Sequence, residues 1–193
     1  MQKTIRTSHF IIVIGVALVA AAASLALAQQ VRQLNLRGDR FKPLTWETLD
    51  ADQKTMVNDL LSGTRTSLNG PFNVLLRSPK MGNQFQALGE YLRFHSSVPK
   101  KLNEMAILMT ARSWDSPYEF YSHSMQALDA GLDAAIINDI RANKRPSKMQ
   151  PEEAVVYDFC AELRARRGVS DENFKRAKEM LGEQGVEIGR AHV

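Results

Sequence analysis

Glu119 and His123 lie four residues apart in the segment 113–131, SWDSPYEFYSHSMQALDAG. On a helix this spacing places both side chains on one face, where a carboxylate and an imidazole can handle protons together. The preceding predicted helix carries two further charged residues in a strongly apolar segment, Glu104 and Arg112. Buried carboxylates need partners, so these four side chains are expected to satisfy one another. Two interpretations follow: an internal polar network, or a site whose pKa values are shifted for proton transfer.

A metal site is a third interpretation of Glu104, Glu119 and His123, because carboxylates and imidazole are acceptable metal ligands. One histidine with two acids is nevertheless a weak pattern for metal binding. We therefore expect no metal at these residues.

The chain contains one cysteine, Cys160, so it can form neither an internal disulfide nor a dithiol redox pair. The cysteine lies on the apolar stripe of an amphipathic helix, together with Val155, Val156, Phe159 and Leu163. This setting predicts a buried, unreactive thiol.

The apolar residues that must position these groups recur with a helical period along nearly the whole chain after Gln29. Capping residues such as Asp50, with Gln53 three residues later, and Asp133 combine with prolines and glycines to divide the pattern into helices. Seven helices are expected, at about 50–63, 79–94, 99–114, 116–131, 133–142, 151–168 and 170–185. Residues 29–46 form an irregular lead-in. The sequence therefore predicts an all-α fold of about seven helices with short connections. The basic turn at 164–168 is expected to complement the dipole of its helix.

Length and charge narrow the class of protein. At 193 residues the chain has room for one domain with a sizeable core. Setting aside residues 1–28 removes two of the 25 basic residues and none of the 21 acidic ones, which leaves a net charge of +2. No basic cluster with interleaved aromatic residues remains, so a nucleic-acid partner is not expected.

The first 28 residues have the three parts of an export signal. A positively charged start, MQKTIRTSH, precedes an uncharged apolar segment and the small residues ALA before Gln29. Cleavage after Ala28 would release a periplasmic or secreted protein. The alternative is an uncleaved membrane anchor, because about 18 to 20 apolar residues can span a bilayer.

Most of the chain after residue 45 resembles the carboxymuconolactone decarboxylase family, within the alkyl hydroperoxidase D-like superfamily. The resemblance extends to residue 187 and rests on the order and spacing of several pieces: LRF at 92–94, Pro99, Glu104, AILMTAR, YEFYSH, and Ala127 through Leu132, with GPFNVLLRSP upstream and VYDFCAEL and VSDENF downstream. It implies one domain over 47–187 with the helical bundle of that superfamily. It also implies a homo-oligomer, commonly a trimer or a hexamer.

The peroxidase branch of this superfamily has two redox cysteines between its glutamate and its histidine. Counted from Glu104 to His123, the matching positions are Ser116 and Glu119. Without a thiolate nucleophile, redox peroxidase activity is not expected.

The decarboxylase branch works without a metal or an organic cofactor. By resemblance, Glu104, Glu119 and His123 are the catalytic candidates, with His123 as the proton donor and Glu119 tuning or positioning it. Arg93 or Arg112 would bind the carboxylate of a small-molecule substrate. We expect a cofactor-independent enzyme that decarboxylates or isomerises a small lactone or carboxylic acid. The alternative is a non-catalytic small-molecule-binding or assembly protein that keeps the fold and uses the Glu/His network structurally.

The last residues, EIGRAHV, depart from the family pattern, in which a further apolar helix would follow. The string also matches the translation of a common sequencing adapter. We therefore expect residues 188–193 to be a non-native tail, and the native continuation to contribute to the core or to an oligomer interface.

Overall fold

The computed structural model describes residues 34–38 and 40–191, with the backbone alone for 188–191. Within these residues there are eight α-helices, one 3-10 helix and no strand, which confirms the predicted all-α class. None of these helices is both long and apolar enough to cross a membrane. The expected export signal at 1–28 and the last two residues of the expected tail lie outside the described residues.

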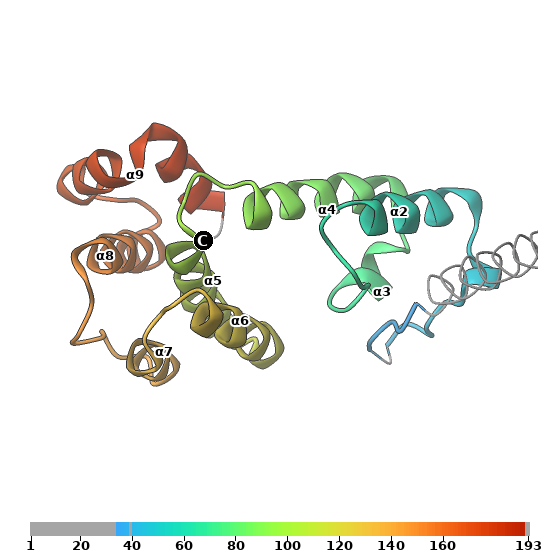
Figure 1. Ribbon diagram of the computed structural model, residues 1–193, viewed down its shortest axis with the longest axis horizontal. Coiled ribbons are helices and arrows are strands. Elements are labelled where there is room, and N and C mark those ends of the chain that lie inside the picture. The colour runs from blue at the N-terminus through green and yellow to red at the C-terminus, as the bar shows by residue number, and fades with distance from the viewer. Residues whose placement is uncertain (1–33, 39, 192–193) are drawn as a thin grey trace, which may run out of the picture. The chain divides into compact units, whose positions relative to one another are not determined.

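The chain divides into two compact units, with the boundary between Ala87 and Leu88. The first unit contains η1 (Trp46–Thr48), α2 (Ala51–Ser62), α3 (Phe72–Leu75) and the first part of α4 (Pro79–Phe94). In this unit α2 contacts the first part of α4, where Asn83 Nδ2 donates to Asp59 Oδ2 at 2.6 Å and Lys80 pairs with Asp52 at 3.4 Å (Figure 1). The Gln53 side chain of α2 also donates to the carbonyl of Leu76, which directly follows α3, at 2.8 Å.

Local sequence determines where α2 begins. Asp50 accepts a hydrogen bond from the Gln53 amide at 2.8 Å, and Gln53 Oε1 accepts one from the Asp50 amide at 2.9 Å. This reciprocal pair is the capping box that the sequence indicates. By contrast, α3 was not expected, because the residues before and within it are typical of a turn. It is a single helical turn whose Phe72 and Leu75 are buried in the core of the unit.

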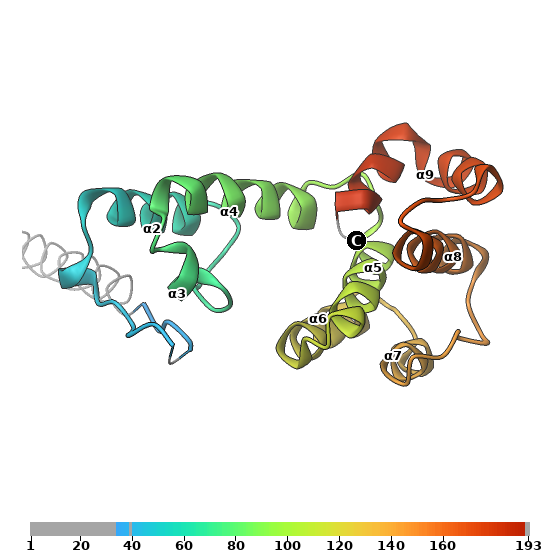
Figure 2. The same ribbon diagram turned by 180° about the vertical axis from the view of Figure 1, so that it is seen from behind.

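The second unit contains α5 (Lys100–Ser113), α6 (Pro117–Asp129), α7 (Ala134–Arg141), α8 (Pro151–Arg166) and α9 (Asp171–Ala191). Helix α5 lies at its centre and contacts α6, α7 and α8, while α9 packs against α8 (Figures 1 and 2). Because α5 has neighbours on several sides, it buries nearly all of its length, and Met105 and Leu108 have no exposed surface.

Helix α9 is interrupted at Gly182, where φ is 71° and ψ is 175°. A residue with a Cβ rarely adopts this conformation, so glycine permits the change of direction. The segment after the interruption returns to the core and buries Val186.

Helix α6, which carries His123, ends in a Schellman motif. The Leu132 amide donates to the Ala127 carbonyl and the Gly131 amide to the Leu128 carbonyl, each at 2.9 Å. Gly131 has a φ of 87°, and Leu132 is buried directly after it. The positive φ at Gly131 thus turns the chain so that Leu132 enters the core.

Gly131→Ala tests this termination. Alanine at a positive φ is strained, so we expect the substitution to lower the free energy of unfolding by about 1 kcal/mol. Gly168→Ala is the matched control, because Gly168 lacks a positive φ and its Cβ would meet nothing within 4 Å. Urea denaturation of the two variants measures the difference. Equal stability of Gly131→Ala and the wild type would contradict the assignment.

Candidate functional site

The centre of the candidate site is a glutamate buried in the core of the second unit. Glu104 lies on α5, between core residues on either side along the chain, and is 2% exposed. An isolated carboxylate at such a position carries a large desolvation cost, so it needs a partner that donates a hydrogen bond.

That partner is His123 on α6. Its Nδ1 lies 2.6 Å from Glu104 Oε2, which is a short hydrogen bond between two buried side chains. Helix α6 presents His123 to α5 on the same face as Phe120, Ser124 and Ala127, all of which are buried. The proline at the first position of α6 fixes where the helix starts and therefore which residues form this face.

The second carboxylate faces the other side of the imidazole ring. Glu119 Oε2 lies 3.5 Å from His123 Nε2, and the Glu119 side chain is 44% exposed. The four-residue spacing thus places Glu119 and His123 on one face of the helix, as expected from the sequence. The His123 ring lies between the buried carboxylate of Glu104 and the partly exposed carboxylate of Glu119. Glu119 also occupies the first turn of α6, where a negative charge interacts favourably with the helix dipole.

These surroundings raise the pKa of His123 above its ordinary value. Burial of the ring opposes protonation, but the hydrogen bonds with Glu104 and Glu119 and the charge of Glu104 outweigh it. The positive charge of Arg93 acts in the opposite direction. The imidazolium is therefore more populated near neutral pH than in an ordinary histidine, and it can act as an acid.

Arg93, near the end of α4, is the arginine whose charge reaches His123. Its Nη2 donates to Gln126 Oε1 at 2.6 Å, and its Nε is buried with no hydrogen-bond partner among the described residues. Gln126 was not among the residues singled out from the sequence. It lies three residues after His123 on α6, so the helical periodicity that places Glu119, four residues before His123, beside the ring could also have identified Gln126.

Arg112 is located elsewhere in the second unit. Its Nε donates to the Arg141 carbonyl at 2.9 Å, and Nη1 forms an ion pair with Asp115. It lines a cavity of about 490 Å³ that none of Glu104, Glu119 and His123 lines. The structure therefore brings three of the four charged residues together and places Arg112 in a separate cluster.

The two carboxylates face different nitrogens of the His123 ring. A metal ion bound by one nitrogen and one carboxylate would have the ring between itself and the other carboxylate. Among the described residues, no group of three or more histidine, cysteine, aspartate or glutamate side chains could hold a metal ion.

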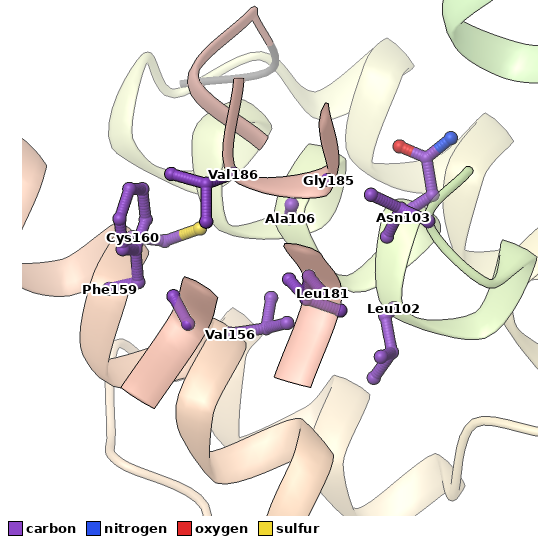
Figure 3. Close-up of a pocket in the computed structure, with 11 residues that line it drawn as sticks. Leu102, Asn103, Ala106, Val156, Phe159, Cys160, Leu181, Gly185 and Val186 are labelled. Carbon is purple, nitrogen blue, oxygen red and sulfur yellow. The ribbon is translucent and has the colours of Figure 1, made fainter. Parts of the chain in front are cut away.

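Cys160 on α8 is 1% exposed, and burial raises the pKa of its thiol to about 12. It lines an apolar cavity between α5, α8 and α9, in which Figure 3 shows it together with Val186 of α9. The space amounts to about 20 Å³, which is room for about one water molecule. The thiol therefore has the buried, unreactive surroundings expected from the sequence.

Comparison with known proteins provides no further assignment for this site. No family model matches the chain, and neither a curated protein nor a solved structure matches it.

Glu104→Gln tests the coupling between the inner carboxylate and the imidazole. The glutamine keeps the shape of the side chain but removes its charge, so we expect the pKa of His123 to fall. Glu119→Gln should lower the pKa less, because its contact with the ring is longer and more exposed. Titration of the His123 ring protons by NMR measures both changes.

The same coupling predicts how stability depends on pH. Because folding raises the pKa of His123, its contribution is complete below the unfolded value of about 6.5 and is lost as the pH rises through the folded value. The difference in the free energy of unfolding between the wild type and Glu104→Gln should therefore shrink as the pH rises from about 6.5 through the folded pKa of His123. An unchanged pKa of His123 in both glutamine variants would contradict the assignment.

Proposed function

We propose that this protein is a cofactor-independent proton-transfer enzyme of the carboxymuconolactone decarboxylase type, acting on a small lactone or carboxylic acid. The observation that carries the proposal is the 2.6 Å contact between the buried Glu104 carboxylate and His123 Nδ1. It fixes the orientation of the ring and leaves Nε2 as the nitrogen that can exchange a proton with a ligand.

The three residues have different roles in this proposal. Glu104 is a positioning residue, because its carboxylate accepts a hydrogen bond from the Nδ1–H group and stabilises the imidazolium. His123 is the catalytic acid, donating its Nε2 proton to the substrate. Glu119 lies on the exposed side of Nε2, where it hydrogen-bonds the ring in the free enzyme and can move aside for substrate.

For a β-keto acid the step is balanced without any co-reactant. The bond between the carboxyl carbon and its neighbour breaks, carbon dioxide leaves, and the electron pair remains on the neighbouring carbon as an enolate. The Nε2 proton of His123 then adds to that carbon, and the imidazole is reprotonated from solvent. In an isomerisation the same proton shuttles between two positions of the substrate.

Arg93 is the better candidate for binding the substrate carboxylate. Its charge reaches His123, and its buried Nε has no hydrogen-bond partner in residues 34–38 and 40–191. Arg112 instead forms an ion pair with Asp115. The arrangement supports binding near the imidazole through Arg93, in agreement with one of the two alternatives that the family resemblance implies.

The superfamily's bundle topology and the export of the protein are parts of the same proposal. Both rest on the sequence, through the resemblance over 45–187 and through the three-part segment at 1–28. The helical content of the described residues is compatible with this topology.

His123→Gln tests the catalytic role. A screen of lactones and of 2-oxo and β-keto acids against the full chain first identifies a substrate, with carbon dioxide release and solvent deuterium incorporation as readouts. We expect kcat of His123→Gln to fall by about 10²- to 10⁴-fold, the usual contribution of a general acid. Circular dichroism confirms that the variant remains folded.

Arg93→Gln and Arg112→Gln form a matched pair for the binding role. Loss of a carboxylate-binding guanidinium should raise KM by about tenfold or more for Arg93→Gln, and Arg112→Gln should leave KM near the wild-type value. Full turnover by folded His123→Gln would refute the catalytic proposal, and equal effects of the two arginine variants would refute the assignment of Arg93.

A second proposed function is assembly into a homo-oligomer, and a specific surface favours it. Four large apolar side chains on α6 are exposed: Tyr118, Tyr121, Met125 and Leu128. Their spacing of three, four and three residues forms one stripe along the helix, as in the contact seam of paired helices. The stripe is exposed where the structure describes the chain, and a second copy of the chain is a suitable cover for it.

Tyr121→Glu tests assembly, because Tyr121 has the largest exposed fraction of the stripe, at 69%. We expect the wild type to sediment as an oligomer and the variant to shift toward the monomer mass, because a buried charge without a partner opposes association. Lys175→Glu on the exposed surface of α9 is a charge-change control that should not alter the mass. A monomeric wild type would rule this function out.

A further inference from the structure

A third cavity in the same unit has the volume and chemistry of a ligand site. It measures about 750 Å³ and lies among the end of α5, the turn after α7 and the last part of α8. Pockets of about 300–1,000 Å³ are typical of small-molecule sites. Neither His123 nor the two glutamates beside it line this cavity, so it is distinct from the site of the proposed function.

The charge of this cavity has one sign. Arg164 and Arg167 line it, and no aspartate or glutamate does so among the residues that the structure describes. The two acidic residues of α8 that are closest in sequence to Arg164 pair with other arginines. Asp158 forms ion pairs with two arginines outside the cavity, and Glu162 forms one with Arg166. The two guanidinium groups therefore present a positive charge that no acidic residue of the lining balances.

The guanidinium of Arg164 is already oriented by the fold. Its Nη1 donates to the Met109 carbonyl at 2.9 Å, which ties the end of α8 to α5. Its Nε is buried and has no hydrogen-bond partner within the part of the chain that the structure describes. Because α5 holds Nη1 in this way, a carboxylate in the cavity would be bound by the remaining N–H groups of the guanidinium.

Aromatic side chains line the same cavity. Trp114, which ends α5, is 78% exposed, an unusual degree for the largest apolar side chain. Tyr157 of α8 is half-buried, and the guanidinium of Arg145 lies 5.6 Å from its ring centroid, which helps to hold the ring in place. An exposed indole beside two arginines suits a ligand that has both an aromatic ring and a negative charge.

We propose that this cavity binds a small aromatic carboxylate, with its carboxylate on Arg164 and Arg167 and its ring against Trp114. The cavity at Arg112 and Arg141 is the nearest comparison, but there Asp115 lines the wall and pairs with Arg112. The cavity at Arg164 has no such acidic residue in its described lining, so it is the stronger anion site of the two cavities. The ligand class follows from the lining, independently of any reaction at His123.

Isothermal titration of the full chain with 2-naphthoate tests the proposal, and 2-naphthylmethanol is the neutral analogue of the same size. We expect 2-naphthoate to bind at least about tenfold more tightly than the alcohol, because the carboxylate forms charge-assisted hydrogen bonds. We also expect inorganic phosphate to bind more weakly than 2-naphthoate, because it lacks a ring to contact Trp114.

Variants then locate the site. Arg164→Gln and Arg167→Gln should each weaken 2-naphthoate binding by about tenfold. Arg166→Gln is the matched control, because Arg166 lies on the same helix, has a 74% exposed side chain and does not line the cavity. Trp114→Ala should weaken binding of 2-naphthoate but leave binding of phosphate unchanged. His123→Gln should bind 2-naphthoate as the wild type does, which separates this proposal from the catalytic one.

Four results would overturn the inference: no binding of 2-naphthoate, equal affinity for the alcohol, equal affinity for phosphate, or equal effects of Arg166→Gln and the two cavity variants. Arg167→Gln keeps the test valid if Arg164→Gln fails to fold, because Arg167 follows the last residue of α8 and is exposed.

Discussion

The hydrogen bond between Glu104 and His123 is a strong constraint on how the second unit packs, because both side chains are buried. It joins the two most extensively packed helices, α5 and α6, through side chains that are 2% and 6% exposed. Removing one partner of such a pair costs about 3–5 kcal/mol, because the remaining group stays buried without compensation. The contact therefore favours only those arrangements of α6 in which His123 faces Glu104 on α5. Apolar packing by itself would tolerate other rotations of α6.

The remaining features of α6 follow from this register. The residues that share the inner face with His123 are small or aromatic and fill the space against α5, whereas the opposite face presents the stripe of exposed tyrosines, methionine and leucine. Glu119 lies at the boundary between the two faces, and it is therefore half-exposed while still reaching the imidazole. Helix α6 thus contributes one face to the buried site and the other to an exposed surface. Rotating the helix about its axis would move His123 away from Glu104 and turn the exposed stripe toward the core.

The two ligand sites proposed in this unit differ in their chemistry, and both use α5. Glu104 lies in its first half, where the helix is buried on most sides, and Trp114 lies at its end, where the chain leaves the core. The first site pairs acids with a histidine and is suited to moving a proton. The second pairs arginines with aromatic rings and is suited to holding an anion. Arg164 contributes to the structure as well as to the second site, because its bond to the Met109 carbonyl ties α8 to α5.

The sequence by itself determined the features that depend on neighbours within a few residues. The caps at Asp50 and Asp133 and the proline that starts α6 fix helix ends through local hydrogen bonds and a fixed φ, and they are present in the structure. The pairing of Glu119 with His123 follows from helical periodicity for the same reason. The single turn of α3 was not predictable, because burial rather than propensity holds it.

Tertiary structure alone decided which distant groups meet. Nothing local indicates that Arg93 bonds Gln126 while Arg112 turns to Asp115 and Arg141, or that Arg164 lies beside Met109 and lines a cavity with Trp114. Each of these cross-helix contacts joins residues 29 to 55 positions apart, except the short pair with Asp115. They arise from the way the helices pack, and packing depends on the shape of the whole core rather than on the spacing of any one segment.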